Sequence, residues 1–247
     1  MTSDWDRWVV LLGIELKSVR ESWGWVLGLS ALYPLSLLFL MKFSGAATPQ
    51  AAARILSGGI VFSVALNSAL ALGQELSGIR ESASFDFYAG LPVGPLQVVA
   101  AILVRNVLLS LPAAIGVAVL GAAFLSVPLP SLVWALPYLL LTCAALAGAG
   151  ALIGFYAPSA RAANMMTQAG YMVVVFFSPL MFPVQALPPG VRFVAYLFPT
   201  TYAADALQLL IASKGFDSRL ALDAAVLAGF SILSYLSLRG RLRWSLD

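Results

Sequence analysis

The sequence contains no histidine and only one cysteine, and charged residues make up 10% of its 247 positions. Without histidine, the chain lacks the commonest metal ligand and general base of proteins. Cys143 cannot form an internal disulfide, and it lies in an apolar run where a thiol acts as a small hydrophobic side chain. Phosphate-loop, zinc-protease and serine-hydrolase motifs are also absent from the sequence. These absences exclude a phosphate-loop nucleotide site and predict that the chain itself is not an enzyme.

Apolar residues, in contrast, are abundant. They make up 61% of the chain, against roughly 45–50% in soluble domains, where about 25% of residues are charged. No water-soluble core of this length needs so much apolar surface, whereas a bilayer supplies an apolar solvent for it. The composition therefore predicts one all-α integral membrane domain over residues 1–247.

Six stretches are long and apolar enough to cross a bilayer, for which about 20 residues are needed. Gly148, Gly150 and Gly154 recur in the fourth of them, as expected where helices approach closely. The predicted spans are 24–43, 54–74, 96–125, 132–156, 165–181 and 220–238.

Three segments between or before these spans have other patterns. Residues 4–23 place apolar side chains three or four apart, including Trp5, Trp8 and Trp23, and predict a helix that lies in the membrane interface. An amphipathic helix packed on protein is the alternative. Residues 77–89 predict a short polar helix ended by the glycine and proline that follow. Residues 187–212 are proline-rich and predict short helices that dip into the outer leaflet.

The distribution of basic residues predicts the orientation, because short loops rich in lysine and arginine stay in the cytoplasm. Six spans place both termini on one side, which carries nine of the 14 basic residues. We therefore expect cytoplasmic termini in a multi-pass protein of the inner (plasma) membrane. The nine residues are Arg7, Lys17, Arg20, Arg80, Arg105, Arg161, Arg239, Arg241 and Arg243.

Two segments resemble a known family. Arg80 and Glu81 precede a small polar turn, an aromatic residue and an acid, and a proline follows. Between the last two predicted spans, Ser178-Pro179-Leu180-Met181-Phe182-Pro183 is followed by Pro199-Thr200-Thr201-Tyr202. In this order and in these gaps, the segments resemble the permease subunit of ABC-type exporters of the type-2 permease class. Ala83, Phe85 and Asp86 depart from that pattern, where glycine, leucine and glutamate are common.

The resemblance implies a partner and a role for several residues. Such permeases pair as homodimers or heterodimers and sit on separate ATP-binding subunits, which bind ATP and Mg²⁺, while this chain binds no cofactor. The segment 77–89 would be the coupling helix, an α-helical contact with the ATPase; the alternative is a loop that covers helix ends. The implied coupling residues are Arg80, Glu81, Ser84, Phe85, Asp86, Phe87 and Tyr88.

Cargo residues are implied less specifically. Polar side chains on or beside the predicted second and fifth spans are candidates for the pathway, although each is better suited to a helix–helix hydrogen bond than to a contact with the cargo. They are Asn67, Ser68, Asn164, Thr167, Gln168 and Tyr171. The re-entrant segment 187–212 would form an outer lid, with Phe182, Pro183, Pro188, Pro199, Tyr202 and Asp205.

The expected function is the transmembrane subunit of an ATP-driven exporter of hydrophobic or amphipathic cargo, such as a drug or a lipid-linked molecule. Membrane lipids and this cargo are the expected small-molecule partners, and no nucleic acid is expected. Two alternatives remain. One is a polytopic membrane enzyme that acts on a lipid-like substrate. The other is an ATP-independent carrier or channel, which the scarcity of charges inside the predicted spans disfavours.

Overall fold

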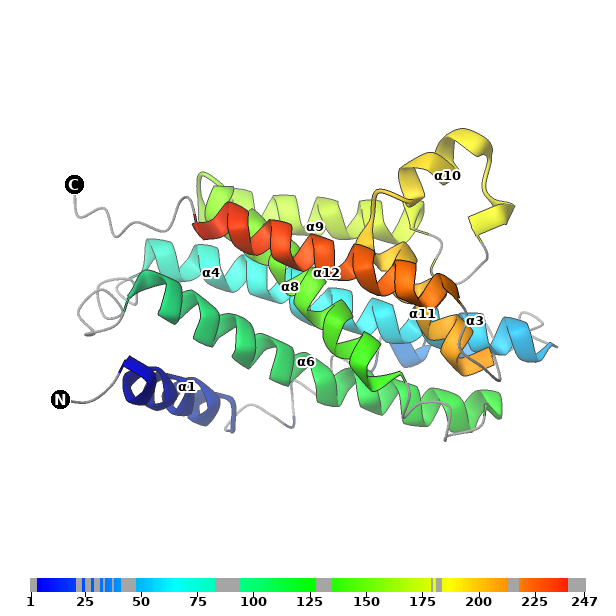
Figure 1. Cartoon of the computed structure of the whole chain (residues 1–247), viewed down its shortest axis with the longest axis horizontal. Helices are drawn as coiled ribbons and strands as arrows, with labels where there is room; N and C mark the ends of the chain where they lie inside the picture. Colours follow the sequence, from blue (N-terminus) through cyan, green and yellow to red (C-terminus); the bar gives the residue numbers. More distant parts are fainter. Residues whose placement is uncertain are drawn as a thin grey trace.

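The computed structural model describes residues 4–20, 24, 28, 32, 34–36, 38–40, 48–82, 94–127, 135–178, 180, 184–212 and 218–239. Every regular element in these ranges is helical, and the longest helices run along the long axis of the molecule (Figure 1). The predicted first span, 24–43, lies mostly outside the described residues. The described part therefore confirms an all-α protein.

α3, η1 and α4 are continuous, and η1 is a π-helical segment between two α-helical ones. The bounds are α1 (Asp4–Arg20), α3 (Pro49–Val64), η1 (Ala65–Ala71), α4 (Leu72–Glu81), α6 (Pro95–Leu125), α8 (Leu136–Tyr156), α9 (Ala160–Phe177), η2 (Val184–Ala186), α10 (Pro189–Ala195), α11 (Pro199–Ala212) and α12 (Ser218–Arg239).

Within the described ranges, four helices are long and apolar enough to cross a membrane. They are Pro49–Glu81, Gln97–Leu125, Leu136–Tyr156 and Ser218–Leu238, and they coincide with the predicted second, third, fourth and last spans. The predicted fifth span corresponds to α9, which is not among these four.

The second helix is longer than the sequence pattern predicts. It was expected to end at Gln74, but it continues to Glu81, and Ser82 then has an extended backbone. The apolar stripe continues as well, because Leu76 is buried and Ile79 packs beside it. The predicted separate helix 77–89 therefore starts as the last turns of α4. At 1.5 Å per residue, the 33 residues span about 50 Å, more than the ~30 Å apolar core of a bilayer.

The turn between α8 and α9 is shorter than predicted. The sequence pattern placed a turn at 157–164, but α9 begins at Ala160 and ends at Phe177. Ser159 caps this helix, because its hydroxyl accepts a hydrogen bond from the Ala162 amide at 3.1 Å. Asn164 is consequently a helical residue.

α8 lies at the centre of the bundle and packs against α12, α4, η1, α6, α9 and α11. Its glycines permit this. A Cβ atom on Gly150 would lie 2.4 Å from the Ala69 carbonyl oxygen, and one on Gly154 would lie 2.8 Å from the Gly73 oxygen. Two of the small residues predicted for close helix approach, Gly150 and Gly154, thus lie where α8 meets the second helix, and the third, Gly148, lies against Ser234 of α12.

α1 packs against α6 at the end of the molecule where both termini lie (Figure 1). Leu11 and Glu15 are buried, while Val10 and Ile14 are exposed. One side of the helix therefore contacts protein and another is exposed. This packing matches the alternative of an amphipathic helix on protein, and the position in the membrane interface stays a prediction. The buried side also includes a charge, that of Glu15.

Candidate transport site

Arg80 and Glu81 bind the turn between α8 and α9. Arg80 Nη1 donates to the carbonyl oxygens of Gly154, Phe155 and Ala157 at 2.9–3.1 Å. The last carbonyls of a helix have no partner within the helix, and a cation there also complements its dipole. Glu81 Oε1 accepts from the Ala160 amide at 2.6 Å, at the start of α9. Two adjacent side chains of α4 therefore hold the end of one helix and the start of the next.

A buried ion-pair cluster joins three helices beside this turn. Arg105 of α6 donates to Glu15 of α1 at 2.6 Å and also pairs with Glu75 of α4. Glu15 is 4% exposed, so its charge is buried and needs a partner. Arg105, which the sequence analysis counted only among the basic residues of the expected cytoplasmic side, therefore fastens α1 and α4 to α6.

An apolar cavity of about 180 Å³, partly open to the surface, lies between η1, α8, α9 and α11. Its walls are mostly alanine, glycine and aliphatic side chains, and few hydroxyls reach it. Thr167 and Tyr171 from α9 contribute the polar atoms on one side, and Thr200 from α11 contributes one on another. The lining suits an apolar group and offers no charge among the described residues.

Two of the six predicted pathway residues line this cavity, Thr167 and Tyr171. The Tyr171 ring also packs against Phe62, with 5.3 Å between ring centroids. Asn164 accepts a hydrogen bond from Gln74 at 2.8 Å and so joins α9 to α4. Gln168 is exposed on α9.

The other two, Asn67 and Ser68, belong to η1 and bond to protein. Asn67 Nδ2 donates to the Ser63 carbonyl at 2.9 Å. The Ser68 hydroxyl donates to the Ser110 hydroxyl at 2.7 Å, and Ser110 donates to the Asn106 carbonyl at 2.8 Å. The Ser68 contact matches the helix–helix alternative, because Ser110 belongs to α6, whereas the Asn67 side chain bonds within its own helix.

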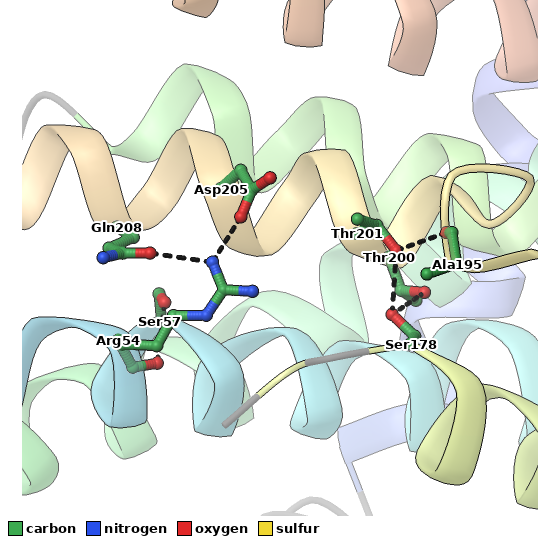
Figure 2. Close-up of polar contacts among 8 residues, drawn as sticks. All are labelled: Arg54, Ser57, Ser178, Ala195, Thr200, Thr201, Asp205 and Gln208. Atoms are coloured by element: carbon green, nitrogen blue, oxygen red, sulfur yellow. Dashed lines mark hydrogen bonds and ion pairs between the residues drawn. The ribbon is translucent and has the colours of Figure 1, made fainter. Parts of the chain in front are cut away.

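At the opposite end of the molecule, an arginine holds α11 against α3. Arg54 is 4% exposed, and its Nη1 pairs with Asp205 and donates to Gln208 Oε1 at 2.7 Å (Figure 2). Asp205 and Gln208 lie nearly one helical turn apart on α11, so both can face one guanidinium group. The Arg54 contact therefore fixes α11 over the N-terminal part of the second helix.

The beginning of α11 is held by a second group of hydrogen bonds. Thr200 Oγ1 donates to Ser178 Oγ at 2.9 Å, and Thr201 Oγ1 donates to the Ala195 carbonyl at 2.6 Å (Figure 2). Ser178 and Thr201 are also 3.2 Å apart, and all three hydroxyl side chains are buried. The start of α11 is thereby joined to the ends of α9 and α10.

The predicted lid residues are distributed over this region. Pro188 precedes α10, and Pro199 starts α11 and borders the cavity. Tyr202 packs near Tyr196 with 6.0 Å between ring centroids, and Asp205 pairs with Arg54. The remaining predicted lid and coupling residues lie outside the described residues: Phe182, Pro183, Ser84, Phe85, Asp86, Phe87 and Tyr88.

Sequence reasoning missed the partners of Arg54 and Arg105. Each is a lone cation near the edge of an apolar stretch, and each acid that binds it is distant in sequence. A charge in such a position requires a partner, so the sequence did indicate that each arginine pairs with another residue. The identity of the partner depended on the folded arrangement.

A comparison with protein-family models finds a match over residues 25–211 to the family described as ABC-2 type transporter. The chain belongs to the ABC-2 type transporter family. A search of curated proteins found no match. As a member of this family, the chain is a multi-pass transmembrane component of an ABC transporter, a class of component that works with an ATP-binding subunit. The match confirms the predicted resemblance.

Proposed function

We propose that this ABC-2 chain is the transmembrane subunit of an exporter that moves hydrophobic or amphipathic cargo out of the cytoplasm, driven by separate ATPase subunits. Six spans, including 24–43 and α9, cross the inner membrane, and a second copy or a paralogue completes the permease. The observation that carries the proposal is the apolar cavity between η1, α8, α9 and α11. Glu81 holds the α8–α9 turn at one end of the molecule, and Arg54 holds α11, part of the predicted lid, at the other.

The cavity supports the choice of cargo. At about 180 Å³, it accepts part of a molecule, such as a ring system or a section of an acyl chain. A charged headgroup would lose its hydration there without a charged partner among the described lining residues, which is costly. An apolar portion of the cargo would enter this cavity, and any polar portion would stay nearer the membrane surface.

The tie at Arg80 and Glu81 supports a route for the mechanical coupling. The predicted ATPase-contacting residues, 84–88, follow α4 directly in sequence. A push on them reaches α4 and, through Arg80 and Glu81, the α8–α9 turn. Arg80 and Glu81 are thus positioning residues that transmit movement, and 84–88 make the contact with the ATPase.

The two ends of the molecule support the orientation. The N- and C-terminal ends lie at the same end of the long axis as the close of α4 and the start of α6, whereas α10 and the start of α3 lie at the other (Figure 1). Cytoplasmic termini then place the coupling segment inside and the lid, α10 and α11, outside. In this orientation the cargo enters from the cytoplasmic side and leaves past the lid, which is export.

The test is a pull-down of the tagged chain from its native membrane, followed by measurement of ATPase activity. An ATPase should accompany the parent chain and be lost when 84–88 are scrambled. The matched control is a scramble of 213–217, which changes an equally short segment between α11 and α12 and should retain the ATPase. Glu81→Gln should retain the ATPase too, because Glu81 bonds to the Ala160 amide within this chain. No ATPase with the parent chain would refute the proposal.

The cargo is tested separately with the purified complex in vesicles. We expect lipophilic cations or fluorescent lipid analogues to stimulate ATP hydrolysis. Leu146, which lines the cavity, offers a matched pair of variants. Leu146→Phe fills the cavity and should weaken stimulation, whereas Leu140→Phe on the exposed face of α8 should not. Stimulation by hydrophilic solutes alone would contradict the cargo class.

A further inference from the structure

The π-helical segment η1 divides the second helix into two parts that are out of register. An α-helix advances by about 100° per residue, and a π turn contains one residue more than an α turn. The side chains of α4 therefore point about 100° away from where an unbroken α-helix would place them. The contacts of Arg54 in α3 and of Arg80 in α4 form in one continuous helix that contains this offset.

Both parts are held at their far ends. Arg54 holds the outer part to α11, and Arg80 and Glu81 hold the inner part to the α8–α9 turn. Rotation or sliding of the whole helix would break both sets of contacts. If the π turn moves along the helix instead, only the residues that it passes change their direction, and both ends stay in place.

The surroundings of η1 permit such a movement. Ala65, Ala69 and Leu70 border the cavity, so there is space beside the segment. The present position is held by the hydrogen bond from Ser68 to Ser110. On another side, the backbone of Gly150 closely contacts Ala69, which prevents outward bending toward α8.

We propose that η1 is a register joint, in which displacement of the π turn re-aims residues 65–71 and changes the cavity wall while both tied ends of the second helix stay fixed. This inference rests on the proposed exporter function. The joint lets a push from the ATPase alter the walls around the cargo without release of the Arg54 contact. Ser68 leaves Ser110 in the displaced state, whereas Gln74 stays beside Asn164.

The test uses two double-cysteine variants in a Cys143→Ser background, because the Cys143 thiol contacts Ser68. Ser68→Cys/Ser110→Cys replaces hydroxyls that are 2.7 Å apart across η1 and α6. Gln74→Cys/Asn164→Cys is the control across α4 and α9, where the amide groups are 2.8 Å apart. Because cysteine is shorter than either of these side chains, this pair is joined with a short membrane-permeable bifunctional thiol reagent, whereas the first pair is oxidised to a disulfide. Each complex is treated without nucleotide and after trapping with ATP and vanadate, and mass spectrometry then gives the cross-link yield.

The yield for Ser68→Cys/Ser110→Cys should fall about tenfold in the trapped state, as expected when most of the population changes register. The yield for Gln74→Cys/Asn164→Cys should stay constant. If the Ser68→Cys/Ser110→Cys pair is oxidised before ATP is added, ATP hydrolysis should slow, and a reductant should restore its rate.

Two outcomes would overturn the joint. A constant yield for both pairs means that η1 does not move, and a parallel fall means that the second helix moves as one body. The reduced complexes test the exporter function separately, through their binding of the ATPase and their basal ATP hydrolysis. If the complex binds the ATPase and hydrolyses ATP but gives either of these two outcomes, the register joint is refuted and the proposed exporter function is not.

Discussion

Replacement of Gly150 by alanine should destabilise the protein, because the added Cβ meets backbone atoms. It would lie 2.4 Å from the Ala69 carbonyl oxygen and 2.9 Å from the Ser68 oxygen. Carbonyls within a helix cannot turn aside as the end of a side chain can. α8 and η1 would therefore have to separate, and overpacking of this kind costs about 1–3 kcal/mol.

Helix propensity acts in the opposite direction and must be separated from the steric term. Alanine is favoured over glycine by up to about 1 kcal/mol in a helix interior. Gly116 provides the matched control, since it lies inside α6 and a Cβ there would meet nothing within 4 Å. Gly116→Ala should gain the propensity term alone. The difference in unfolding free energy between the two variants therefore gives the cost of the steric contact between the added Cβ and η1, which we expect to be about 1–3 kcal/mol.

The assay is thermal unfolding of each purified variant in the same detergent. About 2 kcal/mol corresponds to a Tm difference of about 4–8 °C for a chain of this size. Gly148→Ala should fall between the two variants, because it meets only the side chain of Ser234. If Gly150→Ala and Gly116→Ala unfold within about 1 °C of each other, the close approach of α8 to η1 is refuted.

Further predictions concern the charged contacts. Arg105→Leu should destabilise the chain by about 3–5 kcal/mol, because Glu15 is left buried without its cation. Restoration of stability by the added change Glu15→Leu would support this reason, and unchanged unfolding of the single variant would contradict it. For Arg54→Met and Asp205→Asn, a double-mutant cycle should give a coupling of about 0.5–3 kcal/mol, and additivity would disprove the pair. Glu81→Ala should speed hydrogen exchange at the Ala160 amide, whereas equal protection would show that Glu81 does not cap α9.

Much of the architecture followed from local pattern. Spans 96–125 and 220–238 were predicted within two residues of α6 and α12, because their apolar runs end at recognisable signals. Gly94 and Pro95 start α6, and Ser126 ends it with a left-handed backbone (φ 59°). Boundaries failed where the apolar pattern continued beyond the expected membrane edge, as it does after Gln74.

Residue roles were harder to predict than helices. Arg80 and Glu81 were recognised as a pair by resemblance, and the role this implied was contact with an ATPase. In the structure, both side chains face the α8–α9 turn. No local signal reports this, because the turn is more than 70 residues away along the chain. The predicted ATPase contacts at 84–88 stay a prediction.

By itself, the sequence determined that this protein forms helices in a bilayer, since apolar composition and the length of an apolar run can be read from neighbouring residues alone. It also determined the family, whose motifs are short and contiguous. Only the tertiary structure decided which acid neutralises Arg54 and which neutralise Arg105, where the cavity lies, and that the second helix includes a π turn. Each of these depends on atoms that are distant in sequence and that packing brings within a few ångströms.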